Sequence, residues 1–292
     1  MLVAAMIWGS AFVAQRLSLD AIGPFLFTGL RFLLGAGVVL LFVACMRLRR
    51  APIAAPARNT AALLRAGGAL GLLLAFAISM QQIGLQYTKV ANAGFISSLY
   101  VVIVPLIGAL FGHRTGLGTV LGALFAAVGM YFLSVNEHFS MLYGDWYQLA
   151  GAIVISAQVM LVGRFARRHD PLSLALVQFV TCGVVCLAIA VAYEPLRLAD
   201  IVRAAPSIVY GGALSVGIAY TIQVVAQKNA APAHAAVIFS MEGVFAALAG
   251  WFVLGETLSA RALLGCALML AGLIVCQVLP QPAARRNAAS VG

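Results

Sequence analysis

Long apolar runs, interrupted by short polar stretches, set the pattern of this chain. When the runs are cut at charges, prolines and glycine-rich turns, ten helical segments remain. The first segment lacks the positively charged region of a signal peptide, so we expect a spanning helix there and not a cleaved leader. The ten segments are residues 1–15, 24–46, 66–86, 91–112, 117–135, 145–163, 171–195, 206–227, 230–256 and 262–279.

The composition indicates that lipid surrounds these segments. Of the 292 residues, 63% are hydrophobic and only 9% are charged, and the mean hydropathy is +1.05. A soluble domain carries about 25% charged residues. We therefore expect an all-α integral membrane protein with ten transmembrane helices, and the lipid bilayer as its surroundings. The loops are too short to hold a separate catalytic domain.

The net charge of +10 is distributed unevenly among the predicted loops. With the N-terminus placed in the cytoplasm, twelve lysines and arginines fall in inside loops, five fall in outside loops, and Arg31 lies within the membrane. This bias follows the positive-inside rule. It predicts a multi-pass protein of the inner (plasma) membrane with both termini in the cytoplasm. Because the loop positions account for the charge, no nucleic acid is expected as a partner.

The second half of the chain resembles the first. Residues 230–256 align with residues 91–114 after a shift of about 142 positions, and other segments match in the same order at similar shifts. Since each half holds five helices, the second must enter the membrane from the opposite side, which predicts a five-plus-five inverted repeat. The predicted halves are residues 1–140 and 141–292, and chance similarity among helices rich in alanine, glycine and leucine is the alternative. The pairs in the first alignment are His234 with Asn92, Ser240 with Ser98, and Glu242 with Tyr100.

Polar and aromatic residues form stripes along several of the predicted helices. Their spacing places the members of each stripe on one face of a helix. A face that contacts lipid would not carry polar residues. Such stripes contact either one another or a cavity. Hydrogen bonding between helices is the simpler reading for a single residue, whereas a cavity is favoured for the whole set. The candidate substrate-binding residues are Trp8, Ser10, Gln15, Ser79, Gln82, Asn92, Tyr100, Gln158, Tyr220, Gln223, His234 and Glu242.

Two charged residues lie at membrane depth. Glu242 stands near the middle of the ninth segment, where a charge costs about 2.5–3.5 kcal/mol on insertion scales. It could accept a substrate ammonium group, take up a proton as a coupling site, or pair with a neighbour such as Arg31. Arg31 could bind a substrate carboxylate or hold a helix in place, and the second role is favoured.

Two further features predict how the helices end and pack. Glu256 lies at a membrane boundary beside Gly255, where we expect it to cap a helix end. Glycines at seven-residue spacing in the fifth and tenth segments predict close helix packing. These glycines are Gly122, Gly129, Gly265 and Gly272.

Several chemical classes are not expected. The five cysteines lie in apolar runs without C-x-x-C spacing, and the four histidines are scattered, so neither disulfides nor a metal site is predicted. The chain has no phosphate-binding G-x-x-x-x-G-K-[ST] loop, which disfavours ATP-driven transport by this chain. No Ser/His dyad or paired acid and base marks an intramembrane enzyme, and no cofactor is expected.

Four short motifs, taken in their order and spacing, resemble the EamA branch of the drug/metabolite transporter superfamily over nearly the whole chain. Two departures are Gly243, where many members carry proline, and His113-Arg114, which replaces a Gly-Glu pair. The motifs are Trp8-Gly-Ser-Ala-Phe12, the stretch from Pro24 to Arg31, Met241-Glu-Gly-Val-Phe-Ala246, and Leu254-Gly-Glu-Thr257 followed by Gly265 and Gly272.

The resemblance implies ten helices in a five-plus-five inverted repeat, alternating access and export of small metabolites. Exporters of amino acids, including aromatic ones, are among the members of this branch. Glutamines and aromatic residues on a cavity fit a neutral zwitterion with an apolar side chain. We therefore expect a secondary transporter that exports small metabolites, with neutral or aromatic amino acids favoured. A channel or structural membrane subunit is the alternative, and an intramembrane enzyme is less favoured.

Overall fold

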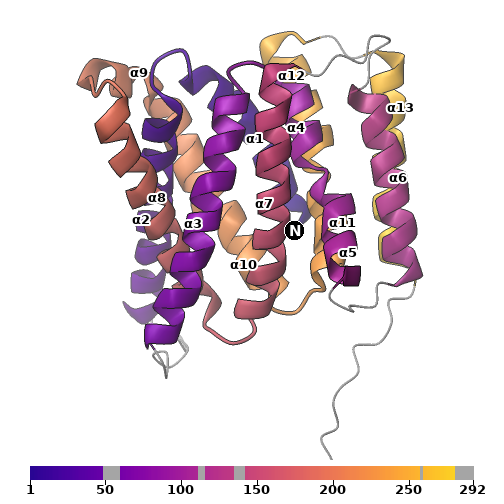
Figure 1. Cartoon of the computed structure of the whole chain (residues 1–292), viewed down its shortest axis with the longest axis horizontal. Helices are drawn as coiled ribbons and strands as arrows, with labels where there is room; N and C mark the ends of the chain where they lie inside the picture. Colours follow the sequence, from indigo (N-terminus) through magenta and orange to yellow (C-terminus); the bar gives the residue numbers. More distant parts are fainter. Residues whose placement is uncertain (49–59, 111–115, 135–141, 257–258, 280–292) are drawn as a thin grey trace, which may run out of the picture.

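The computed structural model describes residues 1–48, 60–110, 116–134, 142–256 and 259–279, and the regular structure within these ranges is helical. The helices run side by side in one bundle (Figure 1). The first half of the chain contributes α1 (Leu2–Ser18), α2 (Pro24–Leu48), α3 (Thr60–Gly84), α4 (Val90–Ser97), α5 (Tyr100–Leu110) and α6 (Leu117–Ser134). The second half contributes α7 (Tyr143–Phe165), α8 (Pro171–Tyr193), α9 (Leu198–Val209), the π-helix η1 (Tyr210–Tyr220), α10 (Thr221–Gln227), α11 (Pro232–Phe239), α12 (Glu242–Leu254) and α13 (Ala260–Val278).

Many of these helices are long and apolar enough to cross a membrane, so the chain is a multi-pass membrane protein. Seven stretches of the described chain meet both conditions. Three shorter apolar helices, Leu2–Ser18, Leu117–Gly129 and Leu263–Cys276, accompany them. The number of ten crossings stays a prediction. The seven stretches are Pro24–Cys45, Thr60–Gly84, Val90–Leu110, Tyr143–Phe165, Pro171–Tyr193, Leu198–Gln227 and Pro232–Leu254.

Two segments that the hydrophobic pattern predicts as single helices are each broken in the middle. The first break separates α4 from α5, and the second separates α11 from α12. In the first, the hydroxyl of Ser98 donates to the Gly94 carbonyl at 2.7 Å, and in the second Ser240 donates to the Val237 carbonyl at 2.8 Å. Hydroxyls that bond back to the preceding turn bend helices. Because the repeat alignment pairs Ser98 with Ser240, the two breaks occupy matching positions.

The predicted helix over residues 206–227 also differs from a regular α-helix. It starts earlier, with α9 at Leu198, and its middle is the π-helix η1. Stretches of π-helix are rare and occur frequently at functional sites. Here η1 packs against both α1 and α2.

Small residues allow helices to approach closely, as the glycine spacing predicts for the fifth and tenth segments. α6 and α13 form a pair at one side of the bundle (Figure 1). A Cβ atom at Gly122 would lie 2.8 Å from the Gly272 carbonyl oxygen, and one at Gly272 would lie 2.7 Å from the Gly122 carbonyl oxygen. Contacts this short exclude any larger residue, so the two backbones touch directly.

Two carboxylates from the second half bind the N-terminal ends of helices in the first half. Glu194 accepts hydrogen bonds from the backbone N–H groups of Phe25 at 2.9 Å and Leu26 at 2.7 Å, at the start of α2. Glu256 accepts one from the N–H of Val90 at 3.3 Å, at the start of α4. Glu256 is therefore a helix cap, as expected, but the helix it caps is α4. Carboxylates at helix N-termini accept hydrogen bonds from free N–H groups and interact favourably with the positive end of the helix dipole.

Candidate functional site

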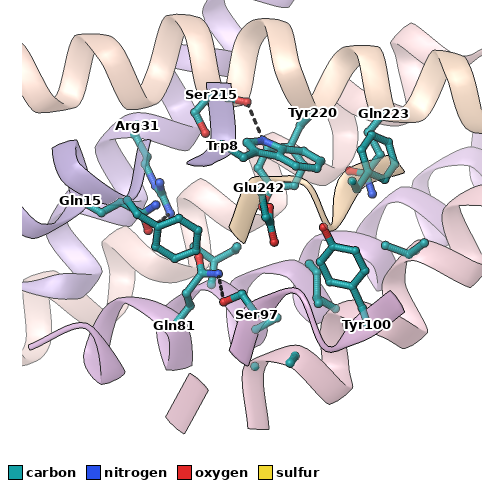
Figure 2. Close-up of a pocket in the computed structure, with 18 residues that line it drawn as sticks. Trp8, Gln15, Arg31, Gln81, Ser97, Tyr100, Ser215, Tyr220, Gln223 and Glu242 are labelled. Atoms are coloured by element: carbon teal, nitrogen blue, oxygen red, sulfur yellow. Dashed lines mark hydrogen bonds between the residues drawn. The ribbon is translucent and has the colours of Figure 1, made fainter. Parts of the chain in front are cut away.

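A cavity lies among helices from both halves of the chain (Figure 2). Side chains of α1 to α5 line it from the first half, and side chains of α7, η1 and α10 to α12 line it from the second. α1 runs close to α12 here, because a Cβ at Gly9 would lie 2.6 Å from the carbonyl oxygen of Glu242. The close approach places the side chains of α1 next to the break between α11 and α12.

Half of the candidate substrate-binding residues line this cavity. They come from five separate elements, α1, α5, η1, α10 and α12, so the fold brings together positions that are far apart in the sequence. Their role in binding a substrate stays a prediction. The six residues are Trp8, Gln15, Tyr100, Tyr220, Gln223 and Glu242.

Three other candidates from the first half lie off the cavity lining and contact neighbouring helices. The hydroxyl of Ser10 lies 2.6 Å from that of Tyr210, and the Ser79 hydroxyl lies 3.6 Å from the Cys186 sulfur. Gln82 donates through Nε2 to the Gln15 carbonyl at 3.2 Å. These contacts correspond to the alternative interpretation of the polar stripes, hydrogen bonding between helices.

The last three candidates are also absent from the cavity lining. Gln158 donates to Oε1 of Gln178 at 3.3 Å, within the second half. The Nδ1 of His234 lies 3.1 Å from the sulfur of Cys276. Asn92 is half-buried on α4. Within the described ranges, no group of three or more histidine, cysteine, aspartate or glutamate side chains is arranged to hold a metal ion.

The polar stripes predicted from the sequence do not include a polar network on the cavity wall. Gln81 donates through Nε2 to the Ser97 hydroxyl at 2.8 Å (Figure 2), and that hydroxyl donates to Oε1 of Gln148 at 3.3 Å. Gln148 in turn donates to the Gln81 carbonyl at 2.8 Å. Gln81 lies one position away from Gln82 in α3, and the cavity lining includes Gln81 but not Gln82.

Aromatic side chains form one wall of the cavity. The Trp8 ring lies 4.6 Å from Tyr220 and 5.2 Å from Phe239, measured between ring centroids. Its indole N–H donates to the Ser215 carbonyl in η1 at 3.4 Å (Figure 2). This bond and the ring contacts fix the indole in place, which leaves a rigid apolar surface beside polar groups.

Arg31 and Glu242 bring opposite charges to the same cavity. Arg31 is 2% exposed and Glu242 is 6% exposed. Among the described side chains, a salt bridge joins Arg203 to Asp200, and none joins Arg31 to Glu242. The pairing that the sequence left open is therefore not formed here.

A bundle of apolar helices around a polar and aromatic cavity is typical of a membrane transporter. The EamA-like transporter family matches residues 1–135 and 142–276 of the sequence. The chain belongs to this family, which confirms the resemblance found in its motifs.

Two curated relatives and one solved structure are similar to the chain. An uncharacterized transporter of Archaeoglobus fulgidus is 29% identical over 276 residues, which cover 93% of this chain and 82% of the relative. A chloroplastic WAT1-related protein of Arabidopsis thaliana is 27% identical over 280 residues, covering 90% of this chain and 65% of the relative. A crystal structure of a protein with 22% identity superposes with a TM-score of 0.71 over 95% of this chain and 99% of that one, which shows a shared fold.

Proposed function

We propose that the chain is a secondary transporter that moves small metabolites by alternating access between two halves, residues 1–140 and 141–292. In this arrangement ten membrane helices form a five-plus-five inverted repeat. The family matches the chain twice, and the first match ends at residue 135 and the second begins at residue 142, which supports this division. The matching breaks at Ser98 and Ser240 support a common plan for both halves.

The cavity carries this proposal, because it lies where the two halves meet. Both halves line it, so a rocking motion of one half against the other would open it first to one side of the membrane and then to the other. Broken helices supply polar backbone groups at such a site, since backbone without a helical partner is tolerated in a membrane only beside protein or a cavity.

The proposed direction is export across the inner membrane, with both termini in the cytoplasm. The distribution of lysine and arginine among the loops supports the placement of the termini, and the direction follows the resemblance of the motifs to exporters. Much of that charge, including Arg49, Arg50 and Arg114, lies outside the described residues, as does His113. The favoured substrates are neutral or aromatic amino acids, because the lining combines amide side chains with aromatic rings.

Counterflow in liposomes tests this function. The purified protein is reconstituted in liposomes loaded with unlabelled amino acids, and entry of labelled phenylalanine, threonine, alanine and lysine is followed with and without a pH gradient. We expect saturable exchange of one class of amino acid. A response to the gradient would add proton coupling. Entry that does not saturate would indicate a channel, and no exchange of any of these amino acids would contradict the proposed substrates.

A further inference from the structure

Two cysteines lie side by side in the core of the bundle. Cys182 and Cys186 stand four positions apart on α8, which places both on one face of that helix. Both are 0% exposed, and their thiols interact with each other. On α3, the hydroxyl of Ser79 lies 3.6 Å from the sulfur of Cys186. The fold therefore gathers two thiols and a hydroxyl in one place, away from the molecular surface.

A charged group accompanies this pair of thiols. A buried cysteine usually packs as a small apolar residue, and the pair does belong to an apolar core cluster together with Phe32 and Phe179. The guanidinium of Arg31, on α2, nevertheless interacts electrostatically with both thiols. Thiolates, not thiols, bind metal ions, and a neighbouring cation stabilises them. This setting distinguishes the pair from cysteines that only fill space.

Arg31 is a buried cation without a counterion among the described residues. It is 2% exposed, and no described carboxylate forms a salt bridge with it. Within the same part of the chain its Nε has no hydrogen-bond partner, and its Nη2 donates to the neutral Gln15 Oε1 at 3.4 Å. A buried charge that lacks a partner is strongly unfavourable. One negative charge is therefore missing beside the two thiols.

A monovalent cation bound by two thiolates supplies that charge. Cu(I) and Ag(I) are soft ions that thiolates select, and two ligands in a line satisfy them. On binding, two S–H bonds break and their protons leave for the medium, while two bonds form between the sulfurs and the ion. The complex carries one net negative charge, which balances the guanidinium. A divalent ion would give a neutral complex and leave Arg31 uncompensated.

We propose that Cys182 and Cys186 form a site for one monovalent thiophilic ion of the Cu(I) class, and that Arg31 balances the charge of the complex. The Ser79 hydroxyl donates to the Cys186 thiolate in this complex and holds it in place. Arg31 lines the cavity and also interacts with the thiols, so the cavity gives the ion a route to the site. This site does not depend on the proposed transport.

Silver binding to the purified full-length chain in lipid nanodiscs tests this site. Ag(I) has the charge of Cu(I) and undergoes no redox change, and glutathione sets its free concentration during equilibrium dialysis. A test variant and a control variant keep two buried cysteines each. In the control the two sulfurs stand ten positions apart on α13, about 15 Å along the helix, so one ion cannot bridge them. The test variant keeps Cys182 and Cys186 and carries Cys45→Ala, Cys266→Ala and Cys276→Ala, whereas the control keeps Cys266 and Cys276 and carries Cys45→Ala, Cys182→Ala and Cys186→Ala.

We expect the test variant to bind one ion per chain about a hundredfold more tightly than the control, because two thiolates on one helix face act as a chelate. Two protons should be released for each ion bound. In the test variant, Arg31→Gln should weaken binding about tenfold, whereas Arg31→Lys should stay within about threefold, since lysine keeps the charge. Thr28→Val should leave the affinity unchanged, because Thr28 is buried in α2 but does not line the cavity.

Three results would overturn the proposal. The first is equal affinity of the test variant and the control. The second is release of a single proton per ion, or binding of two ions to the test variant, because each thiol would then bind an ion alone. The third is an unchanged affinity in Arg31→Gln, which would remove the charge balance. If the multiple variants do not fold, Cys186→Ser in the otherwise unchanged chain decides the matter: it should remove one tightly bound ion per chain, and full retention of that ion would contradict the site.

Discussion

At the residue scale, two glutamates at opposite ends of α12 serve different purposes. Glu242 begins the helix and lines the cavity, where no described cation pairs with it. Glu256 follows the helix and accepts a hydrogen bond from the N–H of Val90 on α4. The same side chain is therefore a candidate ligand-binding group at one position and a helix cap at the other.

The contrast between the two glutamates predicts different transport rates. Glu242→Gln should lower the initial rate of amino-acid counterflow about tenfold or more, because an amide offers no negative charge to a substrate ammonium group. Glu256→Gln should stay within about twofold of the parent, since glutamine keeps an oxygen that accepts from Val90. Both variants are compared in liposomes with equal amounts of protein. Equal rates would contradict the placement of Glu242 in the site.

At this scale the sequence could indicate which side chains line a cavity, but not whether they bind a substrate. Trp8, Gln15 and Glu242 reach the cavity because a polar or amphipathic side chain at membrane depth must contact protein or water. The sequence could not indicate whether Gln81 or Gln82 faces the cavity. Both are amides, and only the packing of α3 against α1 and α7 decides which of them faces the cavity.

At the scale of elements, the positions of most helices followed from the spacing of charges, prolines and apolar runs. The breaks near Ser98 and Ser240 did not, because a hydropathy pattern does not register a hydroxyl that bonds to its own helix. The π-helix η1 also escaped prediction. It changes the number of residues per turn within an apolar run without changing the composition of that run.

The crossing of α4 and α12 gives a prediction about stability. A Cβ at Gly94 would lie 2.6 Å from the Cβ of Ala246, so Gly94→Ala must push the two helices apart and should destabilise the protein by about 1–3 kcal/mol. Gly68→Ala is the control, because its Cβ would meet no atom within 4 Å. Alanine also favours helix over glycine, so Gly68→Ala should be neutral or stabilising by up to about 1 kcal/mol. Thermal unfolding in detergent measures both, and equal melting temperatures would refute the close crossing.

At the scale of the whole molecule, a buried hydrogen bond between Thr88 and Asp145 is among those that join the two halves near the start of α7. The Thr88 hydroxyl donates to Oδ1 of Asp145 at 2.7 Å, and both residues are buried. Asp145 also accepts from the N–H of Leu142. If the halves rock against each other, this contact must separate during part of the cycle.

Cross-linking that contact should stop transport. Thr88→Cys and Asp145→Cys are combined in a background with Cys45→Ala, because Cys45 is an exposed free thiol. We expect oxidation to abolish counterflow and reduction to restore it, whereas each single cysteine variant should remain active under both conditions. Undiminished exchange by the oxidised double variant would show that the halves do not separate there.

The organisation of the whole chain was the part of the fold most open to sequence reasoning. Membrane class and family follow from composition and from motifs spread over nearly the full length. The arrangement of two halves around a shared cavity depends on which helix faces pack together. Stripes of similar residues on many helices leave that choice open, so the contacts across the cavity required the structure.

The exposure of the cavity to the two sides of the membrane tests alternating access most directly. Ser97 lines the cavity and is 3% exposed, and Ser97→Cys places a thiol there with little change in size. In the Cys45→Ala background, a membrane-impermeant thiol reagent is added to one side of the membrane at a time. Alternating access predicts that the reagent labels this cysteine from either side and that bound phenylalanine slows both reactions. Labelling from one side only, at a rate that phenylalanine does not change, would contradict alternating access through this cavity.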